Sequence, residues 1–97
     1  MLKDPQALVV LSGTEIIKDN QYEGKNYEIV FVPKSVTKIG RSAFKDCKNL
    51  RNVVFEDDSK LEKIEFECFC NSSFQEIILP KTLKQIRWNT FKNCKNL

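Results

Sequence analysis

Four cysteines are the residues best suited to chemistry in this 97-residue sequence, which contains no histidine. Cys68 and Cys70 form a Cys-x-Cys pair, with Cys47 before it and Cys94 after it. Four thiolates can bind zinc, but structural zinc sites are typically built from Cys-x-x-Cys pairs, which this spacing lacks. Without histidine, the usual Ser-His-Asp and Cys-His nucleophile pairs are also absent. We therefore predict no metal site, no cofactor, no catalytic residues and no enzyme activity.

The net charge and the hydropathy pattern argue against two further classes of protein. The net charge is only +3, so the sequence lacks the concentrated basic patch of a nucleic-acid-binding protein. The longest apolar run, Ala7 to Leu11, is too short for a membrane-spanning helix or the apolar core of a signal peptide. From the sequence alone we expect one soluble, cytoplasmic domain spanning residues 1–97.

A repeat organises the positions around the cysteines. Its anchors lie 22, 25 and 22 residues apart, and each is followed five residues later by an aromatic residue. The anchors are Ile17, Ile39, Ile64 and Ile86, and the aromatic residues are Tyr22, Phe44, Phe69 and Phe91. A period in the low twenties is typical of solenoids, in which no single unit can bury its own apolar face.

Each repeat combines a strand signal with a turn signal. Val53-Val54-Phe55 and Ile77-Ile78-Leu79 are short β-branched or aromatic runs bounded by turn residues, which indicates strands. Ser42-Ala43-Phe44 and Asn89-Thr90-Phe91 fit one helical or 3-10 turn. We predict an α/β solenoid of about four repeats, incomplete at both ends. A parallel β-sheet forms one side of this short coil, with helical or 3-10 turns and loops on the other.

The order of residues from Ile39 to Leu50, and again from Trp88 to Leu97, resembles the BspA-like leucine-rich repeats of microbial surface antigens. The resemblance covers about residues 14–97. Cys68 and Thr90 replace a small alanine of the pattern, and Ser72 replaces a cysteine. The resemblance implies a leucine-rich-repeat coil and a role in adhesion or protein recognition at a cell surface.

Strand alternation predicts which side chains face solvent. If Val53 and Phe55 point into the coil, the middle residue of each strand must point outward. The outward residues form an apolar ladder across neighbouring strands: Val9, Phe31, Val54 and Ile78. Such a stripe marks a protein-binding surface, although β-propensity alone also explains it as a neutral sheet face.

The two ends of the repeat pattern suggest assembly. Leu97 matches Leu50, but no strand follows it, whereas Leu8-Val9-Val10 is a strand without its preceding repeat. Docking the head of one copy onto the tail of another would complete a repeat, with a contact formed by Leu8, Val10, Phe91, Cys94 and Leu97. The alternative is a fragment trimmed from a longer array.

The position of each cysteine in the repeat predicts whether it is buried or exposed. Cys47 and Cys94 occupy the same position two repeats apart, about 10 Å, which is too far for a disulfide. We interpret these two and Cys68 as small buried residues. Cys70 takes a position held elsewhere by Lys45 and Lys92, so we expect an exposed, reactive thiol there.

Lysines recur at matched positions, including Lys48 with Lys95 and Lys34 with Lys81. A solvated face that keeps the coil soluble explains these rows, and an anionic partner is the alternative. We conclude that the chain is a non-enzymatic protein-interaction module that self-associates head to tail as a homo-oligomer. The alternative is a self-assembling structural protein or a fragment of a larger cell-surface adhesion array.

Overall fold

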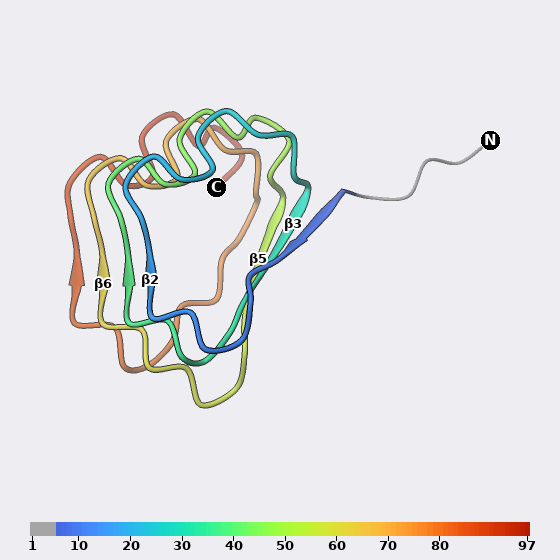
Figure 1. Cartoon of the computed structure of the whole chain (residues 1–97). Helices are drawn as coiled ribbons and strands as arrows, with labels where there is room; N and C mark the ends of the chain where they lie inside the picture. The colour runs from blue at the N-terminus through green and yellow to red at the C-terminus, as the bar shows by residue number, and fades with distance from the viewer. Residues whose placement is uncertain (1–5) are drawn as a thin grey trace.

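The computed structural model describes residues 6–97; the first five residues of the predicted domain lie outside it. This part of the chain winds into a coil of short parallel strands (Figure 1). The strands are β1 (Ala7–Val9), β2 (Ile16–Ile17), β3 (Ile29–Val32), β4 (Lys38–Ile39), β5 (Asn52–Phe55), β6 (Lys63–Ile64) and β7 (Gln85–Ile86). None of the described residues forms a helix with the length and apolar character that a membrane crossing needs.

We call each turn of the coil a rung: rung 1 is residues 6–27, rung 2 is 28–50, rung 3 is 51–74 and rung 4 is 75–97. The rungs build two parallel sheets, sheet A with the order β1-β3-β5 and sheet B with the order β2-β4-β6-β7. The predicted parallel sheet corresponds to sheet A. The predicted anchor residues of the repeat instead form sheet B, whose two-residue strands are too short for a sequence pattern to identify as a sheet.

The turn side of the coil contains no helix within residues 6–97, so the helical or 3-10 turns that we predicted are not found there. Each rung has backbone in the left-handed region at two places four residues apart, and in rung 2 these are Ser42 (φ 55°) and Asp46 (φ 60°). A left-handed residue redirects the chain, which prevents a right-handed helix from propagating. Asn20, Glu67 and Asn89 match Ser42, while Gly24, Asn71 and Asn93 match Asp46.

Hydrogen bonds between rungs replace those of a helix on this side. The backbone N–H groups of Ser42, Phe44 and Asp46 donate to carbonyl groups of the next rung, each at 2.9 Å. Alternate residues thus pair with a neighbouring rung, as in a parallel ladder. The turn side is therefore held by stacking on adjacent rungs.

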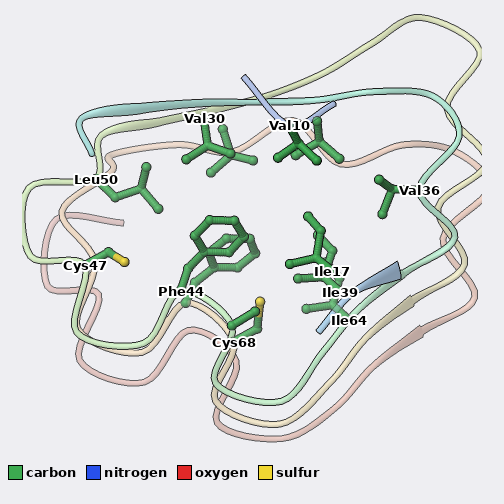
Figure 2. Close-up of a cluster of buried hydrophobic side chains, with 14 of the residues drawn as sticks. Val10, Ile17, Val30, Val36, Ile39, Phe44, Cys47, Leu50, Ile64 and Cys68 are labelled. Atoms are coloured by element: carbon green, nitrogen blue, oxygen red, sulfur yellow. The ribbon is translucent and has the colours of Figure 1, made fainter. Parts of the chain in front are cut away.

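The core is a column of aromatic and aliphatic residues along the coil axis. Figure 2 shows the ring of Phe44 beside a second ring, and Ile17, Ile39 and Ile64 in a column of their own. The aromatic rings of successive rungs stack nearly parallel: Tyr22 to Phe44 at 5.3 Å, Phe44 to Phe69 at 5.6 Å, and Phe69 to Phe91 at 6.0 Å. Phe44 and Phe69 are fully buried, whereas Tyr22 and Phe91 at the two ends are half-buried.

Gly40 permits a close approach between rungs 1 and 2. A Cβ atom at this position would lie 2.6 Å from the backbone N of Asp19 and 2.7 Å from the carbonyl C of Lys18. The approach lets the Gly40 N–H donate to the Ile17 carbonyl at 2.8 Å, and the Arg41 N–H donate to Asp19 Oδ1 at 2.8 Å. Only glycine fits here without displacing backbone.

Candidate functional site

Three of the four residues predicted for the outward ladder meet on sheet A. The strand register places Val9 beside Phe31 and Phe31 beside Val54. Their exposed fractions are 68%, 40% and 45%, whereas their inward neighbours Val30 and Val53 are buried. We call Val9, Phe31 and Val54 the sheet A ladder. It forms one continuous apolar strip on the solvent side of the sheet.

A shallow groove of about 380 Å³ runs beside the sheet A ladder. Its lining includes the three ladder residues together with Val10, Ser12, Val32, Pro33 and Glu56. Ser12, Pro33 and Glu56 were not among the site residues that the repeat pattern predicted. Each of the three follows a strand, and they recur at intervals of about one repeat. This spacing is the sequence signal that could have placed them at the same edge of the groove.

Ile78, the fourth predicted ladder residue, lies apart from the other three. The segment 77–79 forms no strand, and no ladder pairs it with β5. A hollow of about 220 Å³ lies between β5 and residues 76–78. In Figure 1 the trace after β6 and its turn takes its own path beside β5 instead of adding a fourth strand to sheet A. Ile78 is 80% exposed, and the continuous ladder therefore ends at Val54.

The outward face of sheet B has a different character. Its outward row begins with the exposed Ile16, and Lys38, Lys63 and Gln85 follow in register. Ion pairs also join neighbouring rungs around this sheet: Lys84 Nζ lies 3.2 Å from Glu62 Oε1, and Arg87 Nε lies 3.5 Å from Glu65 Oε1. The outward row of sheet B is therefore mainly polar, whereas the sheet A ladder is wholly apolar.

The residues predicted for head-to-tail assembly differ in exposure. Val10 and Cys94 are buried, and Leu8 and Phe91 are partly buried against the core. Leu97 is exposed, together with Ile86 and Trp88 of the same rung. The apolar surface available for contact on the last rung is thus formed mainly by residues other than those that the repeat pattern suggested.

All four cysteines are buried and unbridged, as expected for Cys47, Cys68 and Cys94. Cys47 Sγ donates to the carbonyl of Tyr22 at 3.2 Å, and Cys94 Sγ donates to that of Phe69 at 3.1 Å. Burial raises the pKa of each of the four thiols. Among residues 6–97, no group of three or more candidate ligands is placed to hold a metal ion.

The predicted exposed thiol at Cys70 is wrong, because Cys70 is only 4% exposed. The lysine at the same position in rung 2, Lys45, extends its ammonium outward to Glu67 Oε2 at 3.2 Å. A long lysine keeps its stem against the protein and its charge in water. Cysteine reaches only as far as the beginning of that stem, so its sulfur stays covered.

Comparison with known proteins agrees with this architecture. Residues 15–97 match the family model described as the BspA type leucine rich repeat region (6 copies). A search of curated protein sequences gave no match.

Two solved structures resemble the coil. The pneumococcal vaccine antigen PcpA aligns with a TM-score of 0.79 and 35% identity, over 81% of this chain and 20% of the antigen. A leucine-rich repeat protein from Bacteroides capillosus aligns with a TM-score of 0.72 and 24% identity, over 82% of this chain and 64% of that protein, which supports the fold alone. This chain spans only about a fifth of the pneumococcal antigen. With most of its residues matched by the family model, the chain belongs to the BspA type leucine-rich repeat family.

Proposed function

We propose that this chain is a non-enzymatic protein-interaction module whose sheet A ladder contacts the partner. The observation that carries the proposal is the continuous strip of Val9, Phe31 and Val54 on the outside of a sheet whose inner face already fills the core. An apolar strip of this kind gains free energy when a partner covers it.

The contrast between the two sheets supports this choice of face. Both sheets are parallel and solvent-exposed on one side. Three of the four residues in the outward row of sheet B are charged or amide side chains, with Ile16 as the exception, whereas all three residues of the sheet A ladder are apolar. Solubility alone would favour charged residues on both faces. The groove beside the sheet A ladder also offers a recess for apolar side chains of the partner, with Glu56 at its edge for a basic group.

Matched charge substitutions on the two faces test this proposal. A partner captured by the wild-type chain is purified, and its dissociation constant is measured for wild type, Phe31→Asp and Lys38→Glu. Because central aromatic residues dominate interface energies, Phe31→Asp should weaken binding at least about thirtyfold, while Lys38→Glu should leave it within about twofold. Equal losses from both variants, or an unchanged affinity for Phe31→Asp, would contradict the proposal.

A second candidate function is self-association through the ends of the coil. It rests on the aromatic column, whose terminal rings, Tyr22 and Phe91, are only half-buried, and on the exposed Ile86 and Leu97 of rung 4. A second copy stacked head to tail would continue the column. Such a contact is heterologous and leads to a ring or a filament.

Sedimentation velocity at several protein concentrations tests self-association. We expect a mass that rises with concentration for wild type and remains monomeric for Leu97→Asp with Ile86→Asp. A monomer at every concentration removes this candidate. If Phe31→Asp abolishes association and the double variant does not, the contact lies on sheet A and not at the ends.

A further inference from the structure

Rung 3 has a shorter turn than its neighbours. In rungs 2 and 4 the cysteine position is followed three residues later by a leucine, and the Leu50 N–H donates to Cys47 at 3.0 Å while the Leu97 N–H donates to Cys94 at 3.1 Å. In rung 3, Ser72 occupies the cysteine position and the buried Phe74 follows after only two residues. One residue of the turn is therefore missing in rung 3.

The missing residue leaves a notch of about 530 Å³ between the turns of rungs 2 and 4. Lys48 lines it from rung 2 and Lys95 from rung 4, two rungs or about 10 Å apart. Rung 3 contributes Ser72 and Ser73 between them. The volume lies within the range of small-molecule sites.

The two charged side chains that line the notch are both lysines, although Asp46, outside the lining, accepts a hydrogen bond from Asn71 of the notch. Neither Lys48 nor Lys95 lies within salt-bridge distance of a carboxylate of residues 6–97, whereas Lys45 and Lys84 are both paired with glutamates. No carboxylate lines the notch. An anion between the two ammonium groups would therefore gain two charge-assisted contacts without displacing an existing ion pair.

The remaining lining consists of hydroxyl and carboxamide groups. Asn71, Asn93 and Asn96 contribute the carboxamides. Ser73 Oγ donates to the carbonyl of Lys48, and Asn96 Nδ2 donates to that of Ser73 at 3.5 Å, which ties the three rungs together. No aromatic side chain lines the notch, so the stacking that binds neutral sugar faces is absent.

The unpaired hydroxyl of Ser72 is an independent observation at the notch. This hydroxyl is buried and has no hydrogen-bond partner within the described part of the chain, although the thiols at the same position in rungs 2 and 4 each donate to a carbonyl. A buried polar group without a partner costs free energy, so native proteins rarely retain one without a reason.

We propose that the notch is a binding site for an acidic saccharide, with its anionic group between Lys48 and Lys95. The serine hydroxyls and asparagine carboxamides would then hydrogen-bond the sugar hydroxyls. The site lies on the turn side of rungs 2 to 4, away from the sheet A ladder, and is independent of the proposed protein-binding function.

Titration of the ¹⁵N-labelled chain with D-glucuronate, followed by amide chemical shifts, tests the proposal. D-glucose serves as the neutral control and inorganic sulfate as the control for an anion without hydroxyls. We expect saturable shifts at Ser72 and Ser73 with glucuronate, at least tenfold weaker binding of glucose and sulfate, and weaker binding as salt is raised. Lys95→Gln should reduce the glucuronate affinity about tenfold. The control Lys81→Gln removes a lysine that recurs with Lys34 and lies outside the notch, so it should not change the affinity.

Three results would overturn the saccharide site: no saturable shift at Ser72 and Ser73, equal affinity for sulfate, or equal loss from Lys81→Gln and Lys95→Gln. Phe31→Asp separates this site from the protein-binding face. It should leave glucuronate binding unchanged even where it abolishes partner binding, and a loss of glucuronate binding in this variant would also count against the site.

Discussion

Phe69 is the residue on which the stack of rungs depends most. Its ring is fully buried and packs against three other rings: Phe44 at 5.6 Å, Phe91 at 6.0 Å and the edge of Phe74 at 5.7 Å. Phe69→Leu keeps an apolar side chain there but removes all three aromatic pairs. At about 1 kcal/mol for each pair, the free energy of unfolding should fall by about 3 kcal/mol.

Phe91 provides the comparison at the end of the same column. It pairs with Phe69 and with Phe74, both at 6.0 Å, but its ring is half-buried. Two aromatic pairs that are partly open to water should contribute less than three buried ones. Phe91→Leu should therefore lower the free energy of unfolding by only about 1 to 1.5 kcal/mol.

Urea unfolding monitored by far-ultraviolet circular dichroism measures both variants. The slope against urea should match that of wild type, because the surface exposed on unfolding hardly changes. For a domain of this size, the loss at Phe69 corresponds to a fall in Tm of about 15 °C. If Phe69→Leu costs less than about 1 kcal/mol, or no more than Phe91→Leu, the stacked column does not carry the stability that the geometry assigns to it.

Three further predictions address single positions, and a fourth concerns all four thiols together. Gly40→Ala should lower the free energy of unfolding by about 1 to 3 kcal/mol in urea titrations, and adding Asp19→Ala should not restore it, because the clash is with the backbone of residues 18 and 19. Ser72→Cys should raise the unfolding free energy by about 1 kcal/mol, because a thiol suits this position and removes the unpaired hydroxyl; a lower urea midpoint would count against this reading. Cys70 should resist thiol reagents in the native chain and react once the chain is unfolded, since it is buried and its pKa is raised by burial. Because burial raises the pKa of all four thiols, the unfolded chain loses these protons at lower pH than the folded chain does. The contribution of the thiols to stability should therefore be constant below their ordinary pKa of 9.0 and fall at higher pH, as thermal unfolding at several alkaline pH values would show.

Sequence periodicity was sufficient to identify the repeat, the strands of sheet A and the core. The five-residue spacing from Ile39 to Phe44 recurs in every rung, and a solenoid buries equivalent positions in equivalent ways. For the same reason the burial of Cys47 and Cys94 followed from their shared position. These features are local and repeated, so each copy reinforces the interpretation of the others.

The sequence pattern did not predict the backbone conformation on the turn side. Ser42 and Asn89 read equally well as helix caps, and only the fold shows them in the left-handed region, where the next rung accepts the hydrogen bonds that a helix would make internally. The burial of Cys70 has a similar origin. A position that exposes the end of a lysine does not expose the short side chain of a cysteine.

Contacts between rungs also decided the extent of the candidate sites. Ile78 matches Phe31 in sequence, yet its segment does not pair with β5, so the apolar ladder has three members and not four. The notch at Lys48 and Lys95 lies where the turn of rung 3 has one residue fewer than the turns of rungs 2 and 4. The sequence by itself determined the repeated core positions of each rung, because the burial of those positions recurs with the period of the chain. Tertiary structure alone decided where adjacent rungs separate, because that depends on whether the backbones of neighbouring rungs form hydrogen bonds with each other.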